Sequence, residues 1–70
     1  MSRYAVVIEL ADGNLSAYVP DLPGCVATGA NDEEVRANIA EAVRLHIGSL
    51  REHGDPVPAP RVTTGAVEVA

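Results

Sequence analysis

Two prolines, Pro20 and Pro23, separate stretches of this sequence that cannot belong to one continuous strand. Proline fixes φ and lacks an N–H, so residues 20–24, Pro-Asp-Leu-Pro-Gly, cannot occupy the middle of a sheet. Gly24 permits the backbone conformation that a tight return requires. We therefore predict a stiff corner here, with an extended segment on each side of it.

The segments before this corner alternate between two sets of side chains, which is typical of strands with one buried face. The inward set of the first segment is Tyr4, Val6, Ile8 and Leu10. Asp12-Gly13 is a strong hairpin signal, so residues 3–10 and 15–19 are predicted to form two antiparallel strands. Residues 25–29 are predicted as a short third strand at an edge.

A helix is predicted over residues 31–53. Asn31 is a good N-cap, and Glu34 stands three residues later, as in a capping box. Gly54 is the expected stop, with Pro56 just beyond it. The apolar stripe of this helix consists of Val35, Ile39, Ala42, Val43, Ile47 and Leu50.

The remaining residues predict a fourth strand over 62–69, after a stiff connector that contains Pro56, Pro58 and Pro60. The fold class is therefore α+β, a two-layer β-β-β-α-β domain in which the last strand pairs parallel to the first. One sheet face then has no covering helix. Small size and this uncovered face predict a homodimer or a higher oligomer, in which the last strand could exchange between subunits.

The length and the net charge of the chain limit which functions it can have. The chain has 70 residues, enough for a single domain over residues 1–70, and a net charge of −5. This charge repels phosphate backbones and favours a basic protein partner over nucleic acid. Cys25 is the only cysteine, so no internal disulfide can form. No apolar stretch approaches membrane-spanning length, and we expect a cytoplasmic protein with no membrane association.

Several blocks of the sequence, spread over nearly its whole length, resemble the HicB-like antitoxin family. They are Tyr4, Ser16-Ala17-Tyr18-Val19-Pro20-Asp21-Leu22-Pro23-Gly24-Cys25, Ala27-Thr28-Gly29, Asp32-Glu33-Glu34, Asn38-Ile39 and Val57-Pro58-Ala59-Pro60. The resemblance implies a degraded ribonuclease H-like fold. It also implies a small basic RNA-cleaving partner, a HicA-like toxin, whose active site the antitoxin covers. Many family members carry a carboxy-terminal DNA-binding domain, whereas we expect no separate DNA-binding domain in this chain.

Catalysis is not expected from the ionisable residues. A ribonuclease H-like nuclease needs carboxylates that converge on metal ions, and Glu9 and Glu68 are the only acids within the predicted first and last strands. Cys25 with His46 or His53 matches no nucleophile motif, and the spacing of these three residues is not a metal signature. We therefore predict a protein that is not an enzyme, with no catalytic residues, no metal and no cofactor.

The predicted partner-binding site is the corner with its neighbouring tyrosine. Its residues are Tyr18, Pro20, Asp21, Leu22, Pro23 and Gly24. Rigid apolar groups that are ordered before binding lose little entropy on docking, and tyrosine is favoured at interfaces. Alternatively, the corner only closes the fold and a partner binds the helix or the last strand. An alternative function is a stand-alone homo-oligomeric interaction or regulatory protein of the same family, without a toxin.

Overall fold

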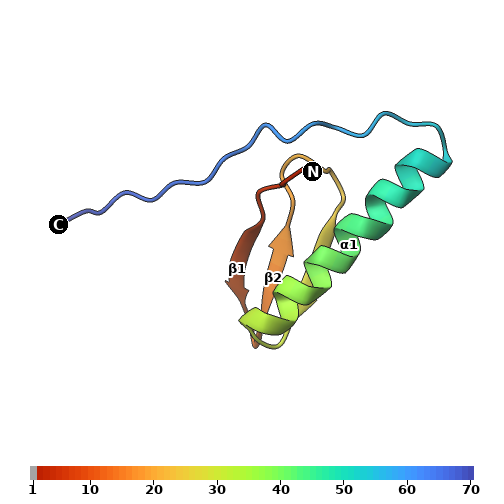
Figure 1. Ribbon diagram of the computed structural model, residues 1–70. Helices are drawn as coiled ribbons and strands as arrows, with labels where there is room; N and C mark the ends of the chain where they lie inside the picture. Colours follow the sequence, from red (N-terminus) through yellow and green to blue (C-terminus); the bar gives the residue numbers. More distant parts are fainter. Residues whose placement is uncertain (1) are drawn as a thin grey trace.

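The computed structural model describes residues 2–70 and shows three strands followed by one long helix (Figure 1). The strands are β1 (Val7–Ala11), β2 (Asn14–Tyr18) and β3 (Val26–Gly29), and the helix is α1 (Asp32–Glu52). The sheet is antiparallel throughout, in the order β1-β2-β3, and α1 covers one of its faces. The predicted α+β class, with three antiparallel strands and one helix, is confirmed.

The β1–β2 hairpin turns through Asp12 and Gly13, and Gly13 has a positive φ of 76°. Its register places Val7 opposite Tyr18 and Ala11 opposite Asn14. β1 begins at Val7 rather than at residue 3, because the partner strand cannot continue beyond Tyr18. The N–H of Val19 is used inside the corner, and proline at the next position has no N–H to offer.

Both ends of α1 are fixed by the residues that the sequence predicts. The Asn31 side chain accepts a hydrogen bond from the Glu34 N–H at 2.8 Å. At the other end Gly54 adopts a φ of 71°, and the Asp55 N–H donates to the Leu50 carbonyl at 2.8 Å. This pattern is a Schellman motif, which needs glycine at the left-handed position.

The core lies between α1 and the strands β2 and β3. Its buried side chains are Ala17, Val19, Leu22, Cys25, Val35 and Ile39. Of the predicted helix stripe, Val35 and Ile39 are buried, whereas the members from Ala42 onward are only partly buried. A helix of 21 residues is about 31 Å long and a five-residue strand only about 17 Å. The second half of α1 therefore extends beyond the sheet.

The predicted fourth strand is wrong for the single chain. Residues 55–70 contain no helix or strand, and nearly all of them are exposed. Figure 1 shows this tail (blue) passing close to the amino terminus and then leaving the body of the molecule. The apolar alternation of residues 62–69 indicates strand propensity, but a strand also needs a neighbour that its backbone can reach. β1 is consequently an edge strand. The prediction places it between β2 and the fourth strand, in the middle of the sheet.

Candidate partner-binding site

The corner consists of two consecutive β-turns closed by a third hydrogen bond. The Leu22 N–H donates to the Val19 carbonyl at 3.0 Å, and the Cys25 N–H donates to the Leu22 carbonyl at 3.0 Å. The Val19 N–H donates to the Cys25 carbonyl at 3.1 Å. Pro23 and Gly24 are the central residues of the second turn, and Gly24 has a φ of 84°. Proline followed by glycine with positive φ is the sequence preference of a type II turn.

Every third residue of this corner points into the core. Val19 and Cys25 are buried, and Leu22 has no exposed surface at all. This corrects the predicted site, because the Leu22 side chain cannot contact a partner while the corner is folded. Burial also raises the pKa of the Cys25 thiol. The exposed remainder of the predicted site comprises Tyr18, Pro23 and Gly24, with Pro20 and Asp21 half-exposed.

Asp21 ties the corner to the carboxy-terminal tail. One of its carboxylate oxygens, Oδ2, accepts hydrogen bonds from the backbone N–H groups of Arg61 and Val62, each at 3.0 Å. The bond from Val62 and then the bond from Arg61 lower the pKa of Asp21 below its ordinary value of 3.8. A second tie joins the amino-terminal segment to the tail, because the Tyr4 hydroxyl donates to the Pro58 carbonyl.

The sheet face opposite α1 carries an apolar row at its corner end. The register pairs Val7 with Tyr18 and Tyr18 with Val26, so the three side chains lie side by side across the strands. They point away from α1, because their neighbours Ile8, Ala17 and Ala27 pack toward it. Tyr18 is 42 % exposed and Val26 65 % exposed. The outer row, as we call Val7, Tyr18 and Val26, lies at the corner end of the sheet, where Pro23 is exposed and Pro20 half-exposed.

The residues considered for catalysis are not assembled into a site. Glu9 lies on the outer sheet face, whereas Glu33, Glu34 and Glu41 are exposed on α1, and Glu68 lies in the tail. His53 is exposed and its Nδ1 lies 2.8 Å from the Ser49 carbonyl of the same helix, while His46 is half-buried. Within residues 2–70, no three His, Cys, Asp or Glu side chains are grouped closely enough to hold a metal ion.

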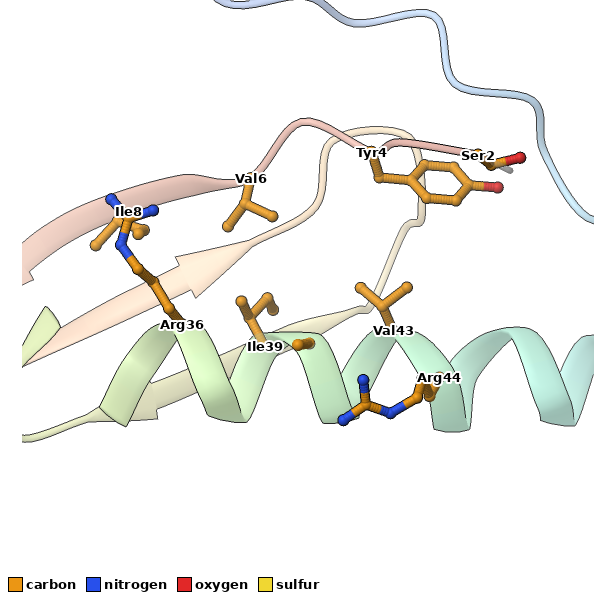
Figure 2. Close-up of a pocket in the computed structure, with 9 residues that line it drawn as sticks. Ser2, Tyr4, Val6, Ile8, Arg36, Ile39, Val43 and Arg44 are labelled. Atoms are coloured by element: carbon orange, nitrogen blue, oxygen red, sulfur yellow. The ribbon is translucent and has the colours of Figure 1, made fainter. Parts of the chain in front are cut away.

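A groove opens between the first segment of the chain and α1. Tyr4, Val6 and Ile8 face Ile39 and Val43 across it (Figure 2). The groove has a volume of about 640 Å³ and is open to solvent. It exists because α1 packs mainly over β3 and β2 and hardly touches β1.

Together these features define a small two-layer α+β domain with a corner closed by backbone hydrogen bonds, an exposed apolar row and an open groove. A model of the family described as HicB_like antitoxin of bacterial toxin-antitoxin system matches residues 4–68. The chain therefore belongs to this HicB-like antitoxin family, as the resemblance of its motifs predicts.

Two relatives span most of this chain. A UPF0150 protein of Thermoplasma acidophilum is 40 % identical over 57 residues, which cover 80 % of this chain and 83 % of that protein. A UPF0150 protein of Synechocystis is 43 % identical over 57 residues, which cover 80 % and 72 % of the two chains. No solved structure matches significantly. In the part of the chain that the structure describes, no helix is both long and apolar enough to cross a bilayer.

Proposed function

We propose that this protein is the antitoxin of a type II toxin–antitoxin pair and that it binds and neutralises a small basic RNA-cleaving toxin of the HicA type. The match of residues 4–68 to an antitoxin family is the observation that carries this proposal. The domain acts by occupying the surface of its partner and covering the active site there. This role requires a stable contact surface and no catalytic group of the antitoxin itself.

The contact surface in this proposal is the outer row together with the exposed side of the corner. Tyr18 contributes a large amphipathic side chain at low cost in conformational entropy. Pro20 and Pro23 stand beside it on turns already closed by the three backbone hydrogen bonds of the corner, so docking orders little additional chain. Leu22 supports this surface from within the core and makes no direct contact.

Charge favours a basic partner over nucleic acid. The chain carries ten acidic and five basic residues, and Glu9 is exposed on the same sheet face as the outer row. A basic toxin is steered toward such a surface, and this contribution to the association rate falls as salt screens it. We place the encounter in the cytoplasm, where an RNA-cleaving toxin finds its substrate.

The experiment is to co-express the protein with the toxin-like gene adjacent to its own and to measure growth rescue and the dissociation constant of the purified pair. Tyr18→Ser should weaken binding by about 2 kcal/mol, roughly thirtyfold, because interface tyrosines are frequent hot spots. Leu45→Ser is the matched control, since Leu45 is a large apolar side chain on the exposed side of α1, 66 % exposed. It should leave the affinity unchanged.

Two results would contradict the proposal at different levels. If the wild-type protein neither binds the adjacent gene product nor rescues growth, the antitoxin function fails. If Leu45→Ser weakens binding and Tyr18→Ser does not, the function stands and the contact surface is the helix. A circular-dichroism melt of both variants verifies that they are folded at the temperature of the assay.

Self-association is part of the same proposal. A domain of this size is only marginally stable as a monomer. In the described residues one sheet face is uncovered and the groove beside β1 is open. A homodimer or higher oligomer covers such surfaces.

A further inference from the structure

The two edges of the sheet differ in how they are covered. At the β3 edge, α1 lies against the strand, and Asn38 Nδ2 donates a hydrogen bond to the Thr28 carbonyl at 2.8 Å. At the β1 edge, nothing among residues 2–70 pairs with the outward backbone groups. An uncovered edge is a template on which another strand can add. Of the two edges, β1 is therefore the one able to accept a strand.

The groove beside β1 shows what kind of strand fits. Tyr4, Val6 and Ile8 are only partly buried, and across the groove Ile39 and Val43 complete an apolar floor (Figure 2). The side chains of Arg36 and Arg44 also line the groove. A strand added at β1 would lie above this floor. Every second side chain of that strand would point into the groove, so it needs apolar residues at alternate positions.

The tail of this chain has that pattern. Val67 and Val69 share one face of an extended segment, with Gly65 before them, and they are 88 % and 89 % exposed. Ala66 and Glu68 lie on the opposite face, where a charge remains in solvent. From Val62 to Val69 the chain spans about 23 Å when extended, enough to run along the whole of β1 and its preceding residues.

The tail is held in a direction that leads away from its own β1. Asp21 binds the N–H groups of Arg61 and Val62, and Tyr4 binds the Pro58 carbonyl. Past these ties the tail leaves the body (Figure 1). To pair with its own β1 it would have to turn out of this course directly after the Asp21 contact and run along the strand (Figure 1). A short stiff connector of this kind favours exchange with a second molecule.

From these observations we propose that residues 62–69 of one copy add to the β1 edge of a second copy, with Val67 and Val69 in the groove lined by Val6, Ile8 and Ile39. The exchange is reciprocal and follows a two-fold axis. In the dimer the two tails therefore cover both β1 edges and fill both grooves. The inference deepens the self-association proposed above and is independent of toxin binding.

The test combines light scattering with amide hydrogen exchange on the full-length protein at a series of micromolar concentrations. We expect a dimer in which alternate amides of residues 64–69, those that face β1, are protected, and this protection should decrease together with the dimer fraction on dilution. Val67→Lys should raise the dimer dissociation constant about tenfold or more, because it places a positive charge over the apolar floor of a groove that Arg36 and Arg44 also line. Ala66→Lys introduces the same charge on the opposite face of the tail and should leave the dimer intact.

Each other outcome overturns the proposal. A monomer with a protected tail means that the tail pairs with its own β1. A dimer with an unprotected tail means that the copies associate through another surface, so self-association survives and strand exchange does not. A monomer with an unprotected tail refutes both self-association and strand exchange. This conclusion holds even if the tail becomes protected when the toxin is added. Equal effects of Val67→Lys and Ala66→Lys would refute the assigned face.

Discussion

Replacing Gly29 with alanine should destabilise the protein through a backbone collision. A Cβ at position 29 would lie 2.5 Å from the Val35 N and 2.7 Å from the Val35 Cα, and both atoms belong to the backbone of α1. The helix must move away from β3 to admit it. Overpacking of this kind costs about 1–3 kcal/mol. The opposing gain from a less flexible unfolded chain is only about 0.4–1 kcal/mol, so we expect a net loss of about 1–2 kcal/mol.

Gly48→Ala is the matched control, because the same methyl group meets nothing there. Gly48 lies in α1, and apart from the adjoining residues and backbone of its own helix no heavy atom comes within 4 Å of its added Cβ. Alanine in a helix interior is favoured over glycine by about 0.5–1 kcal/mol, so this variant should be more stable. Urea and thermal melts at one protein concentration should show Tm shifts of opposite sign, at roughly 4–8 °C per kcal/mol. Equal or higher stability of Gly29→Ala would refute the close approach of β3 and α1.

Four further predictions concern the corner, the helix face and activity. The hydrogen bonds to Asp21 lower the pKa of its carboxyl in the folded protein. Their contribution to stability is therefore complete above the pKa of the unfolded state, and it is lost as the pH falls through the lower pKa of the folded state. NMR titration of the two bonded tail amides should therefore give a midpoint below 3.8, and a midpoint above it contradicts the contact. Leu22→Ala should lower the free energy of unfolding, measured in urea, by about 2–5 kcal/mol. A loss near zero would mean that Leu22 does not fill the core as its burial indicates. Ile39→Ala should cost a similar amount, and Ile47→Ala distinctly less because Ile47 is only partly buried, so equal losses would refute the overhang of α1. The purified protein should not cleave RNA with Mg²⁺ present, and cleavage abolished by Glu9→Gln would revive the nuclease hypothesis.

Local chemistry was sufficient to predict the helix and the hairpin. The Asn31 cap and the Gly54 stop act on backbone groups within a few residues of themselves, so a single sequence contains the whole interaction. The hairpin register also follows from its turn. With Asp12 and Gly13 as the two turn residues, Val7 must oppose Tyr18. Two of the three residues of the outer row, Val7 and Tyr18, could therefore be placed from the sequence, whereas Val26 required knowledge of how the corner folds back.

The features that sequence patterns missed depend on distant contacts. Residues 62–69 have the composition of a strand, but pairing depends on where the connector directs them, and that direction is set by Asp21, some forty positions earlier. Leu22 appears in a stretch of prolines, aspartate and glycine that is typical of an exposed loop. Only the spacing from Val19 to Leu22 to Cys25, three residues at each step, suggests that the two turns bring one side chain in three into the core.

The structure of the corner changes what its sequence motif means for function. In the block from Val19 to Cys25, the prolines and Gly24 meet the conformational needs of two turns, three residues fill the core, and Asp21 holds the tail. Each residue thus has a structural reason to be there, even without a partner. This motif, which is part of the resemblance to the family, is therefore a determinant of folding. Choice of partner has to come from side chains that the fold leaves unconstrained, and on the uncovered sheet face beside the corner these are Tyr18 and Val26. Exchanging these two residues between related antitoxins should accordingly transfer toxin preference, whereas exchanging the corner should not.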